Sequence, residues 1–452
     1  MVEVGDVPDV GSRVRFVATT WNGPTTVEGV LLASSSEGYL TVKLVNGYNA
    51  THSLSSIEKI DVIGNLSVTE GGVTSVEYNP DLPLVHILHT GGTIASKVDY
   101  ETGAVTARFE PEEIISTIPE LLSIARIETR KLGNMWSDDI RAQHWNHMAE
   151  AVTTSFSEGA EGVVITHGTD TMHISSAAIA FAFSGEGGVP PGRIAFTGSQ
   201  RSSDRGSTDG AENLIAAVHW AANGPPPSGA ADSTVVVMHA AGGDDGCMVV
   251  LPGCAARKNH SSRRDAFTAI NQNKIGTIMI AKGELDLKLE EPYNIEAANQ
   301  QRTVQNSPTF FNPEIKILQL VAGSHLFADQ IEHASSNDYS GILFWGTGLG
   351  HLPLDNPGDA PENDEVKNAL TRYVSNGGVA VMASQCISGP VHLDVYSKGR
   401  DQQEIGVLGH GTNFSPETAL VKFHHLLSRG LGGEELRMAW DKNLVGENPP
   451  DI

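Results

Sequence analysis

The sequence predicts an α/β protein in which a small all-β region precedes a larger part built around parallel sheets. Short β-rich runs separated by turn residues fill about the first 75 residues. From about residue 84 onward, apolar strand-like runs alternate with helix-like segments, which is typical of parallel sheets with crossover helices. At 452 residues the chain is too long for one ordinary core, so we expect more than one domain.

The composition excludes several function classes. Lys and Arg number 30 against 54 Asp and Glu, and the formal net charge of −24 argues against extensive direct binding of nucleic acid. No apolar run is long enough to span a membrane, and the first ten residues, MVEVGDVPDV, lack the basic and apolar regions of a signal peptide. Three cysteines without a C-x-x-C pair argue against a disulfide framework and a thiolate metal site. We therefore expect a cytoplasmic protein without membrane contact and without a metal site.

Residues 1–75 are expected to form a small SH3-like β-barrel. Asn46-Gly47 is a typical hairpin turn, and Asn79-Pro80 and Leu82-Pro83 indicate a linker after the barrel. Up to Gly72 this region holds four Lys or Arg against eight Asp or Glu, which favours protein contact or structural packing over nucleic-acid binding. The runs that predict its strands are Val14–Thr19, Val27–Ser34, Tyr39–Val45 and Ile57–Ile63.

Residues 83–293 are expected to form a first α/β domain. Pro111 is predicted to open a helix that continues to Leu122. A later helix has apolar residues at i, i+4 spacing along one face, from Ile140 to Val152. The remaining elements are predicted at Leu84–His89, Val163–Thr166, His173–Phe183, Ile194–Thr197, Ala211–Ala222 and Thr234–His239.

Residues 314–440 are expected to form a second α/β domain. The segment between Asn294 and Pro313 is polar and irregular, which indicates a domain boundary there. The predicted elements are strands at Ile315–Val321, Ile342–Trp345 and Val379–Ser384 and helices at Glu365–Val374 and Pro416–Leu427.

The segment Leu84–Ser96, LVHILHTGGTIAS, carries the first functional motif. An apolar strand ends abruptly at paired glycines and a threonine, as parallel sheets do where they present a ligand site. The glycines allow a sharp turn and a close approach of ligand to backbone, and Thr93 would carry a hydroxyl to the sheet edge. On its own, this pattern is also that of an ordinary tight turn.

A second strand, in Gly162–Met172, opens into HGTDTM in the same way, about 75 residues further on. TGGTIA followed by VITHGTDTM resembles the asparaginase/glutaminase family, and Lys258 in RKNHSSRRDAF stands where that family carries a lysine before an acidic-aromatic run. The resemblance covers about residues 85–430. It implies a two-lobed asparaginase-like α/β fold, with the catalytic lobe at 83–293, and hydrolysis of a carboxamide by a threonine nucleophile.

The same resemblance implies the catalytic roles. Thr93 is the preferred nucleophile, although the sequence leaves open which threonine attacks first. Tyr100 resembles the tyrosine of the family's lid and would polarise that hydroxyl on closure. Thr169, Asp170 and Lys258 resemble a second reactive cluster, in which a desolvated lysine takes a proton through Thr169 and Asp170 pairs with the substrate ammonium.

Three further residues are placed in the substrate-binding part of the site, namely Gly92, Gly168 and Ser137. Backbone N–H groups near Gly92 and Thr169 are candidates for the oxyanion hole. One segment departs from the family, because Gly133-Asn134 stands where many asparaginases carry the Ser-Gln pair that grips the substrate carboxylate. The choice between glutamine and asparagine therefore stays open.

The N-terminal β region distinguishes this chain from free asparaginases. A β module before the catalytic lobes resembles the D subunits of the archaeal glutamyl-tRNA(Gln) amidotransferases, as do KVDYETGAVTARFEPEEI and the segment from Arg257. That branch of the family implies glutamine hydrolysis and delivery of ammonia to a partner E subunit, which binds tRNA(Gln) and uses ATP and Mg²⁺. It implies no cofactor in this chain and a homodimer within a heterotetramer.

Two other functions remain open at this stage. A stand-alone L-asparaginase with an added N-terminal domain predicts rapid asparagine hydrolysis by the isolated chain. A non-catalytic, ligand-binding relative has no need of both Thr93 and Lys258. Glycine-rich GTGLGH, which begins at Gly346, lacks the third glycine of a dinucleotide fingerprint and is not read as one.

Overall fold

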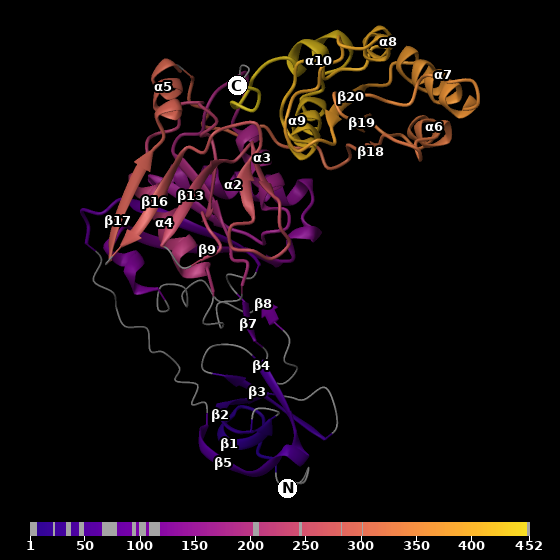
Figure 1. The fold of residues 1–452 in the computed structure, drawn as a ribbon. Helices are drawn as coiled ribbons and strands as arrows, with labels where there is room; N and C mark the ends of the chain where they lie inside the picture. Colours follow the sequence, from indigo (N-terminus) through magenta and orange to yellow (C-terminus); the bar gives the residue numbers. More distant parts are fainter. Residues whose placement is uncertain are drawn as a thin grey trace.

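The structure is a computed structural model of the whole chain. It describes residues 7–20, 23–32, 38–44, 49–65, 79–92, 96–98, 105–107, 118–201, 208–243, 246–281, 283–300 and 302–449. Figure 1 shows a separate N-terminal sheet followed by two α/β units that pack against each other.

The N-terminal sheet has five antiparallel strands in the order β4-β3-β2-β1-β5. Alternate residues of β1 point inward, so Val14, Phe16 and Ala18 form its core with Leu31 and Leu40. The strands are β1 (Ser12–Thr20), β2 (Gly23–Leu32), β3 (Tyr39–Leu44), β4 (Asn49–Ser53) and β5 (Ile57–Asn65), with a short 3-10 turn η2 (Leu54–Ser56).

The predicted β-barrel is not confirmed. Within the part of the chain that the structure describes, no pairing joins β4 to β5, so the sheet has two edges and is not closed. The hairpin between β3 and β4 is present, with Lys43 opposite Asn49, while the turn residues Asn46-Gly47 lie outside the described residues.

The first α/β unit is built on an eight-stranded sheet in the order β17-β16-β13-β12-β11-β10-β6-β9. Its strands are β6 (Leu84–Gly91), β9 (Arg126–Met135), β10 (Gly162–Thr166), β11 (Arg193–Thr197), β12 (Val235–His239), β13 (Cys247–Pro252), β16 (Gly276–Ala281) and β17 (Glu284–Leu289). Smaller elements are β7 (Ser96–Val98), β8 (Val105–Ala107), β14 (Ala256–Lys258), β15 (Phe267–Ala269), η4 (Pro119–Ser123) and η5 (Ser137–Asp139).

The predicted parallel sheet is confirmed only in part of this unit, whose sheet is mixed. Strands β9, β6, β10, β11 and β12 are parallel, but β13, β16 and β17 are antiparallel to their neighbours. The physical reason is the length of the connections. Only a few residues join β12 to β13, which is too short for a crossover helix and forces the chain to reverse.

Helices cover both faces of this sheet. They are α2 (Ala142–Ser157), α3 (Met172–Ala182) and α4 (Gly210–Asn223), while α5 (Glu291–Asn299) follows the last strand, β17. Alternate residues of β10 enter different cores: Val163 and Ile165 pack with α2 and α3, and Val164 packs with α4. The helix predicted from Pro111 differs, because residues 111–117 are not described and Pro119–Ser123 is a short 3-10 segment.

The second α/β unit has a parallel sheet, β18-β19-β20, as predicted for this part of the chain. Its core is continuous with the first unit, because Leu343 and Val381 belong to the same buried cluster as α3 and α9. The elements are β18 (Ile317–Val321), α6 (Ala328–Ser336), β19 (Gly341–Gly346), α7 (Pro361–Ser375), β20 (Ala380–Ser384), α8 (Ser397–Ile405), α9 (Pro416–Ser428) and α10 (Gly433–Trp440). None of the helices in the described ranges is both long and apolar enough to cross a membrane.

Candidate active site

The candidate site lies where three adjacent parallel strands end. His89 of β6 is paired with Thr166 of β10, which is paired with Thr197 of β11, so their following turns leave the sheet side by side. The carboxyl edge of parallel strands is where ligands bind in this class of sheet. The two motif-bearing turns are therefore neighbours in space.

Glycines let these turns touch. A Cβ atom on Gly92, whose φ is +89°, would lie 2.6 Å from the backbone nitrogen of Gly168. A Cβ atom on Gly168 would lie 2.8 Å from Cβ of Ser137, which is buried. Three of the residues predicted to bind substrate, Gly92, Gly168 and Ser137, are thus stacked at one edge of the sheet, and only glycine fits at the first two positions.

Lys258 joins the second motif to a distant strand. Its Nζ donates hydrogen bonds to Thr169 Oγ1, at 2.8 Å, and to Asp170 Oδ1, at 2.7 Å. The lysine side chain is 9% exposed, whereas that of Asp170 is 71% exposed. The carboxylate is therefore both a partner of the buried ammonium and open to a ligand from solvent.

Two other predicted residues, Thr93 and Tyr100, lie outside the described residues. The backbone leading to Thr93 is described up to Gly92, and Gly91 packs against Met135 of β9.

Charges from the second α/β unit border the lysine. A cavity of about 430 Å³ is lined by Asp170, Lys258, Arg257, His173 and Glu417 among others. Arg257 pairs with Glu417 of α9 at 3.1 Å. Burial lowers the pKa of His173 to about 4 against the opposing charge of Glu417, so this histidine is neutral at physiological pH.

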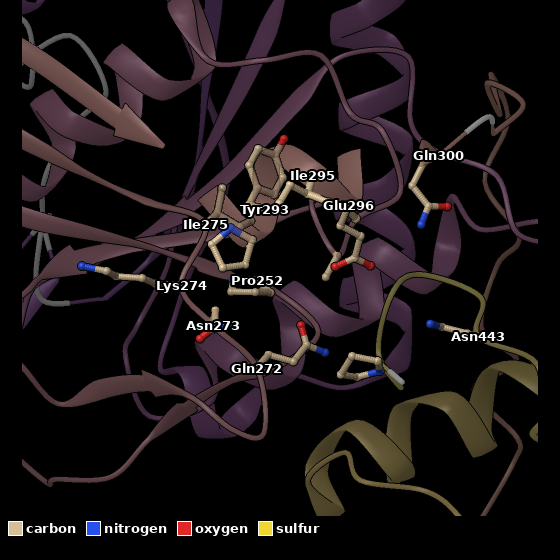
Figure 2. A pocket seen from close by; sticks show the side chains of 14 residues that line it. Pro252, Gln272, Asn273, Lys274, Ile275, Tyr293, Ile295, Glu296, Gln300 and Asn443 are labelled. Carbon is tan, nitrogen blue, oxygen red and sulfur yellow. The ribbon is translucent and has the colours of Figure 1, made fainter. Parts of the chain in front are cut away.

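A different hollow, shown in Figure 2, is separate from this site. It encloses about 400 Å³ and is lined by Pro252, Gln272, Tyr293 and Glu296 among others. Pro252 is paired with the first residue of β12, so this hollow lies at the amino edge of the parallel strands, opposite Thr169.

The sequence analysis did not identify Gln200. It lies just beyond the end of β11, and the Thr169 hydroxyl donates to its Oε1 at 3.5 Å. Its backbone N–H is held by the buried carboxylate of Asp209. The signal was present, because a third apolar strand is followed by Gly198 and Ser199 just as the other two are followed by glycine and hydroxyl residues.

Comparison with known proteins identifies the family. Residues 84–293 match the family description "Asparaginase, N-terminal", and residues 314–439 match "Glutaminase/Asparaginase C-terminal domain". The chain belongs to the asparaginase family. As a member of this family of amidohydrolases it has the family's α/β fold, and a solved structure, the thermostable L-asparaginase from Thermococcus kodakarensis, is 26% identical with a TM-score of 0.65. The matched region covers 81% of this chain and 100% of the asparaginase chain.

Within the asparaginase family, the chain is similar over nearly its full length to a group of archaeal proteins. A protein from Methanopyrus kandleri, named as the D subunit of a glutamyl-tRNA(Gln) amidotransferase, is 34% identical over 97% of this chain and 91% of its own length. A protein of the same name from Metallosphaera sedula is 35% identical over 98% of this chain and 94% of its own length.

Proposed function

We propose that this member of the asparaginase family is the ammonia-producing glutaminase subunit of a glutamyl-tRNA(Gln) amidotransferase. The observation that carries this proposal is the extent of similarity. The two relatives named as D subunits match 97% and 98% of this chain. The L-asparaginase from T. kodakarensis matches only 81% of this chain, even though its own chain is matched over its whole length. A free asparaginase thus accounts for the α/β units but leaves part of the chain unexplained.

The proposed chemistry begins with a primary amide in the cavity beside Lys258. A threonine hydroxyl, Thr93 by preference, attacks the amide carbon and forms a tetrahedral oxyanion, which accepts hydrogen bonds from backbone N–H groups near Gly92 and Thr169. Collapse of this intermediate releases ammonia and leaves an acyl-enzyme ester, and water then cleaves the ester to give glutamate. Tyr100 serves as the lid tyrosine in this scheme.

The roles of the other residues follow from their contacts. Lys258 is linked to Thr169 by a hydrogen bond of 2.8 Å, so a proton can pass between the amine and a water or hydroxyl through that threonine. Asp170 neutralises the ammonium of Lys258 from one side and presents its exposed oxygen to the α-ammonium of the substrate. Ser137 supports the turn, because its carbonyl accepts from the Thr171 hydroxyl at 2.6 Å.

The ammonia is used elsewhere in the proposed assembly. A partner E subunit binds tRNA(Gln), uses ATP and Mg²⁺ to activate the tRNA-bound glutamate, and accepts the ammonia, while this chain needs no cofactor. Two copies of each chain form a heterotetramer in the cytoplasm. The net charge of −24 supports this division of labour, because the partner then meets the RNA.

The test is ammonia release by the chain co-purified with its E subunit. Glutamine hydrolysis is expected to accelerate when glutamylated tRNA(Gln) is added. Lys258→Met is expected to lower kcat about 10²- to 10⁴-fold, the usual contribution of acid–base catalysis. Lys274→Met is the matched control, because Lys274 pairs with Glu290 at the opposite edge of the sheet and is half exposed.

The alternative is a stand-alone L-asparaginase, which the similarity to solved asparaginase structures favours. It predicts fast asparagine hydrolysis that neither the partner nor tRNA changes, and this result would refute the amidotransferase proposal. Unchanged turnover in Lys258→Met would refute the assignment of this site as the catalytic one.

A further inference from the structure

A buried chain of hydrogen bonds ends at the peptide between Gly168 and Thr169. The indole Nε1–H of Trp145 lies 3.2 Å from Ser175 Oγ, which lies 2.9 Å from His167 Nε2. On the other side of the ring, His167 Nδ1 lies 2.7 Å from the carbonyl oxygen of Gly168. His167 and Ser175 are fully buried, and the chain joins α2, α3 and the end of β10.

The partners fix the direction of the two outer bonds. An indole N–H can only donate and a carbonyl oxygen can only accept, so Ser175 accepts from Trp145 and Nδ1 of His167 donates to Gly168. Burial lowers the pKa of His167 to about 4, so the ring is neutral and its one proton lies on Nδ1. Nε2 is then bare and accepts the Ser175 hydroxyl proton.

Holding the Gly168 carbonyl also sets the Thr169 N–H. The two groups belong to one planar trans peptide, so they point in opposite directions. The carbonyl faces the buried ring, and the N–H consequently faces away from it. The backbone hydrogen bonds of the described residues include none in which Thr169 N–H is the donor. A donor that is fixed in direction and not used by the fold is what an oxyanion hole requires.

We propose that His167 is a positioning residue for amide hydrolysis: it holds and polarises the Gly168–Thr169 peptide so that the Thr169 N–H donates to the oxyanion. Donation into the carbonyl draws electron density from the amide and strengthens its N–H as a donor. Ser175 acts one step further back, because its bond to Nε2 holds the His167 ring in this orientation. This inference rests on the proposed function and adds a residue that does not touch the substrate.

Two carboxamide variants of the co-purified complex separate the two ring nitrogens. In His167→Asn the side-chain amide nitrogen occupies the place of Nδ1 and can still donate to Gly168. In His167→Gln the polar group reaches toward Ser175 and the donor to Gly168 is lost. Removing an oxyanion donor outright costs about 10²- to 10³-fold in kcat, so loss of its alignment alone is expected to cost about tenfold.

The expected result is that His167→Gln lowers kcat about tenfold with KM changed less than about twofold, while His167→Asn retains at least about a third of kcat. Equal losses in the two variants, or a change confined to KM, would overturn the proposal. Complete absence of turnover in the unmodified complex, with glutamine and with asparagine, would instead overturn the proposed function on which it rests.

Two further measurements keep the test decisive if a His167 variant fails to fold. Nitrogen-15 NMR of the histidine-labelled chain is expected to show the ring of His167 protonated on Nδ1 and bare on Nε2, the less common tautomer. Ser175→Ala removes one oxygen atom and leaves Nε2 of His167 without its hydrogen-bond partner, so it is expected to lower kcat several-fold while the proton stays on Nδ1. Protonation of the His167 ring on Nε2 in the unmodified chain, or full activity in Ser175→Ala, contradicts the inference.

Discussion

The ion pair between Lys422 and Glu447 offers a sharp test of how the C-terminal segment is held. The two side chains are 1% and 0% exposed, and Nζ lies 2.8 Å from Oε1. Nζ also donates to the carbonyls of Trp440, at 2.6 Å, and Lys442, at 2.7 Å. Burial alone would raise the pKa of Glu447, but the Lys422 ammonium and the Val445 N–H outweigh it and hold that pKa below its usual value.

The magnitudes decide what each substitution does. At an effective dielectric constant of about 20, two charges 2.8 Å apart attract by about 6 kcal/mol. Removing each ion from water costs several kcal/mol, so the intact pair contributes little net free energy. Lys422→Met leaves the carboxylate of Glu447 buried without its counter-charge, and we expect a loss of about 3–5 kcal/mol in the free energy of unfolding.

The assay is urea unfolding followed by far-ultraviolet circular dichroism, for Lys422→Met, Glu447→Gln and the double variant. The double variant is expected to be more stable than the sum of the single losses implies, because no unpaired charge remains. Lys367→Met is the matched control, since Lys367 pairs with Asp401 at 2.6 Å but is 39% exposed. Its expected loss is below about 1 kcal/mol. Equal losses for Lys422→Met and Lys367→Met would refute the reasoning from burial.

Three other predictions concern the site, the pH dependence and the cysteines. Gly92→Ala should lower the melting temperature and glutamine turnover more than Gly159→Ala. Both glycines have φ near +90°, but only at Gly92 would a Cβ atom meet backbone, 2.6 Å from the nitrogen of Gly168. Equal effects of the two variants in thermal unfolding would contradict this clash. Stability to urea should fall as pH drops from about 6.5 to about 4, because the buried His167, His173 and His425 have a lowered pKa and stay neutral in the folded chain while the unfolded chain takes up protons. Each of these histidines contributes up to about 1.4 kcal/mol per pH unit, and a flat pH profile would count against their burial. Iodoacetamide should alkylate the exposed Cys386 in the native chain but spare Cys254, whose thiol is fully buried with a raised pKa, as read by mass spectrometry; early labelling of Cys254 would disprove its burial.

The elements that flank the site, β6, β10, α3, β11 and α4, follow from local sequence. Strands β6, β10 and β11 are mostly apolar runs, and each is followed within three residues by a glycine and a hydroxyl residue. Those features depend on neighbouring residues, so the strand ends that carry Gly92 and Gly168 could be located from the sequence. The antiparallel half of the sheet could not, because strand direction depends on the path of the connections.

Side-chain convergence was decided by the tertiary structure. The contact between Lys258 and Thr169 joins residues 89 apart in sequence, and it exists because β14 returns along α3 toward the carboxyl edge of the sheet. Resemblance to a family suggested this pairing, whereas nothing local indicated the proton position on His167 or the partner of Lys422. Apolar periodicity records which face of an element is buried. Which polar groups then meet depends on how those faces pack, and a buried polar group takes whichever partner the fold brings within hydrogen-bond distance.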